Sequence, residues 1–197
     1  QVHRAGFSTG FEVLGCPTLF MNATPSHGLT LQGKYEIVAR KLRAGHPLRV
    51  AVMLANFDNT ATMAQSAAAV VRLWMQNTDS IFIKQTSNEA STLKRALLAN
   101  NATVAQQRQA QAAIRWYYDV LRWQEALRNG IDFAIGFRIH GSMIALSAAV
   151  PTLIVPPDAR VFELADVMCL ATASPRNPRW QDVDLSNFLA DRLEAFY

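Results

Sequence analysis

Short apolar runs alternate along this chain with longer segments in which apolar residues recur every three or four positions. Continuous runs are typical of strands covered on both faces, and the spaced recurrence is typical of amphipathic helices. The runs predict strands at residues 48–55, 80–84, 132–136 and 152–155. The spaced pattern predicts helices at residues 61–75, 90–98, 104–113, 116–127, 143–148, 161–167 and 185–195. Strands that alternate with helices predict an α/β fold with a Rossmann-like parallel sheet flanked by helices.

Residues 23–47 have the composition of a linker, because Asn, Thr, Pro, Ser and Gly are frequent there. One short amphipathic helix is expected within this segment, with Ile37, Val38 and Leu42 as its apolar face. A new domain then begins at the first predicted strand and extends over residues 48–197.

The start of the chain resembles the end of an earlier domain. Its first residue is Gln1 rather than methionine, and residues 7–15 look like the last turn and strand of an α/β domain. We therefore expect residues 1–22 to be the tail of an N-terminal domain whose earlier part is missing. Such a truncation exposes an apolar former interface, so self-association is expected.

The residues that follow each predicted strand are the candidates for a binding site, because ligands of open parallel sheets bind beyond the carboxyl ends of the strands. Several of these residues are polar or basic, and all are expected along one rim. They are Asn56, Asn59, Lys84, Gln85, Arg138, His140, Pro157, Asp158 and Arg160.

The strongest signal lies where the third predicted strand ends. Arg138 and His140 interrupt the apolar pattern two residues apart, and in an extended chain they project to the same side. Gly141 and Ser142 follow, and Ser142 is expected to cap the next helix. A guanidinium, an imidazole and a helix N-terminus at one sheet edge predict a site for a small anion.

Three ordered segments carry a family resemblance: RIHG at residues 138–141, VPTLIV at residues 150–155 and DARVFEL at residues 158–164. Together they resemble the C-terminal domain of the polysaccharide pyruvyl transferases. The segment VLGCPTLF at residues 13–20 resembles the part that closes the N-terminal domain of that family. The matches span most of the chain.

The resemblance implies a two-domain, glycosyltransferase-B-like protein of which this chain supplies the C-terminal, donor-binding half. Such enzymes transfer pyruvate from phosphoenolpyruvate to two sugar hydroxyls as a ketal, releasing phosphate, in the synthesis of exopolysaccharides and cell-wall polymers. It implies that Arg138 anchors the anionic groups of the donor. It also implies that His140 is the general acid or stabilises the departing phosphate. The other candidate substrate-binding residues are Gly141, Ser142, Asp158, Arg160, Asn56 and Lys84.

Structural interpretations compete with these roles. A lone histidine is more typical of a core residue bonded to the backbone, and it is the neighbouring Arg138, Gly141 and helix start that favour a functional role for His140. Arg138 alone is also typical of an ion-pair partner for Asp132 or Glu163. Asp158 either caps a helix, orients His140 or contacts the sugar. Two other functions also remain open: a nucleotide-sugar glycosyltransferase of the same architecture, and an inactive binding module.

Composition narrows the class of protein. Half of the 197 residues are apolar and 17% are charged, so a packed core is expected. The formal charge of +4 suits anionic small molecules, and no basic-aromatic stacking motif indicates nucleic acid. Two distant cysteines, Cys16 and Cys169, are expected to be small buried hydrophobes, and no residue spacing indicates a metal or cofactor. Without a membrane span or signal-peptide pattern, a cytoplasmic protein is expected.

Overall fold

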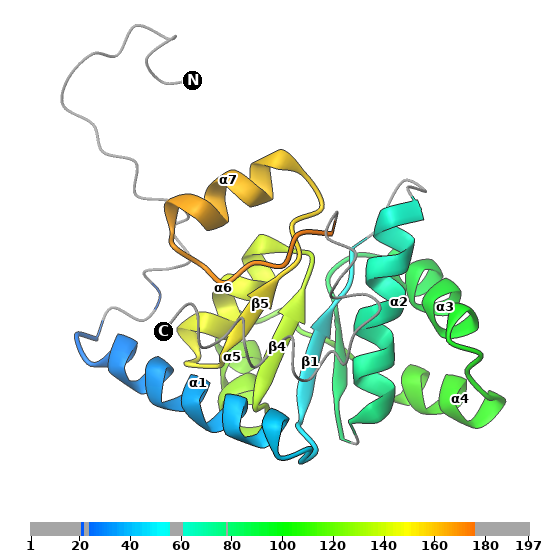
Figure 1. Cartoon of the computed structure of the whole chain (residues 1–197), viewed down its shortest axis with the longest axis horizontal. Coiled ribbons are helices and arrows are strands. Elements are labelled where there is room, and N and C mark those ends of the chain that lie inside the picture. Colours follow the sequence, from blue (N-terminus) through cyan, green and yellow to red (C-terminus); the bar gives the residue numbers. More distant parts are fainter. Residues whose placement is uncertain (1–20, 22–23, 56–60, 78, 176–197) are drawn as a thin grey trace, which may run out of the picture.

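The computed structural model describes residues 21, 24–55, 61–77 and 79–175. Five parallel strands form one sheet in the order β3-β2-β1-β4-β5 (Figure 1). The strands are β1 Val50–Met53, β2 Ile81–Lys84, β3 Ile114–Trp116, β4 Phe133–Gly136 and β5 Thr152–Ile154. This all-parallel sheet with flanking helices confirms the predicted α/β, Rossmann-like fold.

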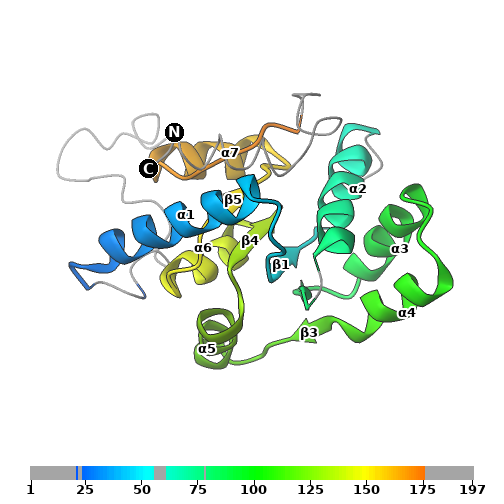
Figure 2. The ribbon, with the colours of Figure 1, turned by 60° about the horizontal axis from the view of Figure 1, so that its bottom comes forward.

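Helices cover both faces of the sheet. They are α1 His27–Arg43, α2 Ala61–Gln76, α3 Glu89–Ala99, α4 Val104–Ala112, α5 Val120–Gly130, α6 Ile139–Ser147 and α7 Ala159–Val167. Helices α1 and α2 lie on one face, and α5 lies on the opposite face (Figure 2). Val50 and Val52 of β1 join the core cluster of α1 and α2, whereas Ala51 and Met53 join that of α5. The two clusters follow the alternation of side chains along a strand.

The sheet order reverses beside β1. The chain runs outward from β1 to β2 and β3, and then returns through α5 to β4 and β5 on the other side. Gly136 of β4 pairs with Met53 of β1, and a Cβ on Gly136 would lie 2.8 Å from the Met53 Cβ. The absence of a side chain lets the two strand ends approach closely. A crevice at such a reversal is the usual binding site of this sheet class.

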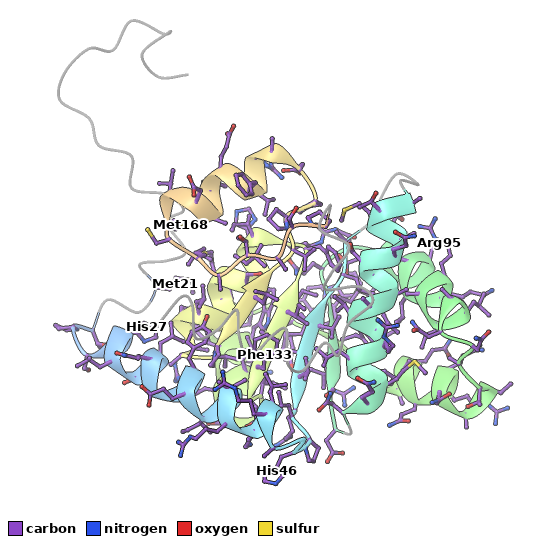
Figure 3. All side chains as sticks on the ribbon, viewed as in Figure 1. Met21, His27, His46, Arg95, Phe133 and Met168 are labelled. Carbon is purple, nitrogen blue, oxygen red and sulfur yellow. The ribbon has the colours of Figure 1, made fainter. Side chains whose placement is uncertain are left out.

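Helix α1 belongs to the core. Phe133, at the centre of the molecule, is fully buried in the cluster that α1 covers (Figure 3). Tyr35 of α1 is also buried, and its hydroxyl donates to the Thr152 carbonyl (3.0 Å) and accepts from the Thr152 amide (3.1 Å). The expected apolar face is correct for Val38 and Leu42 but wrong for Ile37, which is 46% exposed.

The outer edge of β5 is covered along its whole length. Beyond the two bonds from Tyr35, the amide of Ile154 donates to the Ala171 carbonyl (2.9 Å), and the amide of Ala173 donates to the Ile154 carbonyl (2.9 Å). Strand β3 is the other terminal strand of the sheet.

Sequence prediction missed β3. The predicted helix at residues 116–127 is wrong at its start, because Trp116 ends β3 and α5 begins at Val120. Asp119 is the N-cap residue, and its Oδ1 accepts from the amides of Leu121 and Arg122 at 2.7 and 3.2 Å. An edge strand with exposed side chains has no buried apolar run to mark it, so Ile114 and Arg115 fell between two predicted helices and Trp116 was assigned to the second.

Two further expectations can be compared with the structure. Cys169 is exposed, with φ of 50°, so its interpretation as a buried hydrophobe is wrong. Within the described residues, no helix is both long and apolar enough to cross a membrane. The expected N-terminal tail up to residue 20, Asn56, Asn59 and the closing helix at 185–195 lie outside the described residues.

Candidate functional site

A pocket of about 230 Å³ opens at the carboxyl end of the sheet. Its walls come from the segments that follow β1, β2, β4 and β5, so it occupies the crevice expected at the reversal of strand order. The lining residues are Ala55, Gln85, Phe137, Arg138, Ile139, His140, Pro157, Asp158, Arg160 and Val161. The structure therefore brings together Arg138, His140, Asp158 and Arg160, which the sequence placed on one rim.

Arg138 crosses the end of the central strand. Its backbone is extended, with φ −117° and ψ 120°, and its side chain is 29% exposed. The Nε atom lies 2.7 Å from Glu89 Oε1 and 3.3 Å from the Leu54 carbonyl, and Nη2 donates to Thr86 Oγ1 at 3.1 Å. These bonds use Nε and one of the terminal nitrogens. Among the described residues nothing bonds to Nη1, so its two N–H groups remain for a ligand.

Glu89 is the functional residue that sequence reasoning missed. It opens α3, and its side chain is 5% exposed. Oε2 accepts from the Gln85 amide at 2.8 Å, and Oε1 accepts from the Thr86 hydroxyl at 3.2 Å. The helix N-terminus and the Arg138 guanidinium both stabilise a carboxylate at this position. The only signal in the sequence was an acidic residue in the first turn of a helix that follows a strand. From sequence alone, such a residue is interpreted as a helix-start residue.

The ion-pair partners expected for Arg138 are wrong. Asp132 instead accepts from Lys41 Nζ at 2.9 Å and from the Arg49 amide at 2.9 Å, at the opposite end of β4. Arg138 pairs with Glu89, across the end of β1.

The start of α6 also corrects the prediction. The helix begins at Ile139, so His140 lies in its first turn and the extended alternation of Arg138 and His140 is wrong. Ser142 is inside α6 rather than its cap, is fully buried, and donates its hydroxyl to the Arg138 carbonyl at 2.9 Å. His140 is exposed and lines the pocket, so its interpretation as a core histidine is wrong.

Gly141 is buried where α6 meets the segment after β2. A Cβ at this position would lie 2.6 Å from Gln85 Nε2 and 2.6 Å from Met53 Sδ. Gln85 Nε2 is buried without a hydrogen-bond partner among the described residues. Gly141 therefore acts by leaving room for the Gln85 amide, which forms part of the pocket wall.

The opposite wall is the start of α7. Asp158 is its N-cap residue, as expected, and Oδ1 accepts from the Val161 amide at 2.9 Å. The Arg160 side chain is 76% exposed, and its Nη2 lies 4.0 Å from Asp158 Oδ2. No hydrogen bond joins Asp158 and His140 among the described residues, and the largely exposed Arg160 side chain lines the same pocket.

Lys84 lies elsewhere on the rim. Its Nζ is 4.8 Å from the centroid of the Trp116 ring, and it does not line the pocket.

The electrostatics of the pocket favour an anion through dipoles and directed donors. The formal charges of Arg138 and Arg160 are matched by Glu89 and Asp158. Helices α6 and α7 both begin at the pocket, so two positive helix ends add to the guanidinium donors. The described residues contain no group of three or more His, Cys, Asp or Glu side chains that would hold a metal ion.

Comparisons with protein-family models, curated proteins and solved structures give no match.

Proposed function

We propose that this chain is the donor-binding half of a polysaccharide pyruvyl transferase-like enzyme, which transfers pyruvate from phosphoenolpyruvate to sugar hydroxyls as a ketal. One observation carries the proposal. The segments RIHG and DARVFEL, on which the family resemblance rests, follow different strands and line the same pocket. Their polar side chains lie at the carboxyl end of the sheet, where such a fold binds ligands.

Arg138 suits the donor because phosphoenolpyruvate carries a carboxylate and a phosphate. The guanidinium is fixed by Glu89, Leu54 and Thr86, so its free Nη1 donors keep one direction. One N–H of Nη1 and the second N–H of Nη2 are coplanar and parallel, and together they bind carboxylate or phosphate oxygens in a fork. Arg160, which is largely exposed, supplies a second cation that closes over the other anionic group.

His140 lines the pocket and is the proposed proton donor to the bound substrate. In the proposed reaction, it gives a proton to the methylene carbon of the enol, and a first sugar hydroxyl bonds to the neighbouring carbon. The proton of that hydroxyl replaces the one that His140 gave. A second hydroxyl of the sugar then displaces phosphate, which leaves with the second proton. Because His140 is exposed in the pocket, its imidazole has access to the reacting groups in both steps.

The test is calorimetric titration of the chain with phosphoenolpyruvate, inorganic phosphate and a uridine diphosphate sugar. Wild type is compared with Arg138→Lys, which keeps the charge and removes the fork, and with His140→Gln. Arg122→Gln, at an exposed position of α5, is the matched control. We expect phosphoenolpyruvate to bind more tightly than phosphate, and Arg138→Lys to weaken it at least tenfold while Arg122→Gln leaves it unchanged.

Each contrary outcome would support a different function. Tighter binding of the diphosphate sugar would replace the proposal with a nucleotide-sugar glycosyltransferase. Equal weak binding of all three anions, unaffected by Arg138→Lys, would reject the pocket as a donor site and favour a binding module.

A further inference from the structure

Three side chains form a second feature at the carboxyl end of the sheet, here named the aromatic platform: Lys84, Trp116 and Tyr118. Lys84 ends β2, Trp116 ends β3, and the two residues are paired in the sheet register. The Lys84 ammonium lies 4.8 Å from the centroid of the Trp116 ring. The Trp116 and Tyr118 rings stack at a centroid distance of 5.6 Å and an interplanar angle of 22°.

The platform is open to solvent. Trp116 is 42% exposed and Tyr118 is 88% exposed. The chain also contains a comparable stacked pair, Tyr117 and Trp123, which packs into the core beside α5 instead. Large aromatic rings are costly to expose, and an exposed ordered pair is typical of a binding surface.

The chemistry of the platform fits a sugar ring. The face of an aromatic ring is electronegative and attracts the C–H groups on the flat face of a pyranose. Lys84, whose ammonium lies over the face of the Trp116 ring, presents donors for a hydroxyl or a carboxylate, and the largely exposed Tyr118 ring offers its face to the sugar. Val120 and Leu121, at the start of α5, are 40% and 72% exposed and add apolar surface close along the chain.

The platform is adjacent to the donor pocket along the chain. Lys84 is followed directly by Gln85, which lines the pocket, and by Thr86, which accepts from Arg138. The order β3-β2-β1-β4 places three strand spacings between Trp116 and Arg138. At about 4.8 Å for each spacing, the separation is roughly 14 Å, comparable to a short oligosaccharide.

We propose that the aromatic platform binds the acceptor saccharide, two to three sugar rings from the hydroxyls that receive the pyruvyl group. This inference rests on the proposed function, because the saccharide is expected to extend from the donor pocket toward the platform. The platform then determines how long an acceptor saccharide must be and how tightly it binds, while the pocket determines which donor binds.

The test uses the whole chain and two probes, cellotetraose and the acidic tetragalacturonate, followed by saturation-transfer NMR and by tryptophan fluorescence. Trp116→Ala and Tyr118→Ala are compared with wild type. Because Tyr118 is almost fully exposed, its removal cannot disturb the core even if Trp116→Ala weakens β3. Leu98→Ala, at an exposed apolar position of α3, is the matched control. We expect at least one probe to bind, each platform variant to weaken it fivefold or more, and the control to leave it unchanged.

Absence of saccharide binding by wild type at millimolar concentration would overturn the inference, as would binding that both variants leave intact. A single-stranded oligonucleotide that binds the platform more tightly than either saccharide would also reject it. Titration with phosphoenolpyruvate separates the two proposals. Saccharide binding without donor binding rejects the donor pocket alone, and donor binding without saccharide binding rejects the platform alone.

Discussion

The Nε atom of Arg138 and the Oε1 atom of Glu89 lie 2.7 Å apart, although one residue follows β4 and the other opens the helix after β2. The central strand β1 runs between them, so the ion pair spans the reversal of strand order. It joins the two halves of the sheet at the point where the pocket opens. Stability and ligand binding should therefore be linked at this pair.

We expect Arg138→Gln to lower the free energy of unfolding by about 2–3 kcal/mol, because Glu89 stays buried without its cation. The double variant Arg138→Gln with Glu89→Gln should recover part of that loss. Urea denaturation of the four proteins in a double-mutant cycle measures the coupling. The control is Lys41→Gln, whose ion pair with Asp132 is more exposed and should contribute at most about 1 kcal/mol. Additive single effects would contradict a coupled pair.

We expect Gly141→Ala to destabilise the fold by about 1 kcal/mol, because the buried ends of the Gln85 and Met53 side chains must move away from the new Cβ, and the better helix propensity of alanine offsets part of that cost. Gly33→Ala in α1 is the matched control. No atom lies within 4 Å of its Cβ position, so the better helix propensity of alanine should stabilise by about 0.5–1 kcal/mol. Opposite shifts in the thermal unfolding midpoint are expected. If both variants gain stability, the close packing of Gly141 is wrong.

Asp158 has a structural role that can be separated from its charge. Asp158→Ala should lose about 1 kcal/mol of stability with the N-cap bond to the Val161 amide, whereas Asp158→Asn should keep it. Because Asp158→Asn removes a negative charge from the pocket, phosphoenolpyruvate should bind it more tightly than wild type. Calorimetry and thermal unfolding of both variants measure the two effects. Weaker donor binding by Asp158→Asn would instead indicate a direct contact between this carboxylate and the donor.

Burial raises the pKa of the Tyr117 hydroxyl above its ordinary value of 10.0, and the charge of Arg115 lowers it in part. The folded state therefore holds this proton more tightly than the unfolded state. The stability that Tyr117 contributes by keeping this proton is fully present below pH 10 and is lost as the pH rises through the raised pKa. We expect the urea midpoint of Tyr117→Phe to fall less than that of wild type above pH 10. Identical pH profiles for Tyr117→Phe and wild type would contradict the prediction.

Prediction from sequence was correct where the residues of a single segment are enough to identify its structure. The buried runs identified β1, β2, β4 and β5, and the polar residues after them identified Arg138, His140, Asp158 and Arg160 as neighbours on one rim. Strand β3 failed because its side chains are partly or fully exposed.

Contacts between distant segments could not be read in the same way. Arg138 bonds to Thr86 across 52 residues of sequence and pairs with the neighbouring Glu89. Choosing Glu89 over Asp132 requires the order of the strands, which apolar periodicity does not contain. The start of α6 was predicted wrongly for a different reason. Arg138 keeps an extended backbone, and no residue pattern separates it from the helix that begins one position later.

The two bonds from the Tyr35 hydroxyl to Thr152, together with the bonds of Ile154 to Ala171 and Ala173, leave β5 with no free backbone groups on its outer side at these positions. On strand β3, at the other edge, the Ile114 carbonyl accepts from the Arg115 side chain (3.0 Å), and no second backbone segment pairs with its outer side among the described residues. Within the part of the chain that the structure describes, β3 is therefore the edge at which a second copy would extend the sheet. Such growth is one-ended: two copies joined edge to edge consume both open strands, so assembly stops at a pair and does not continue into a fibre.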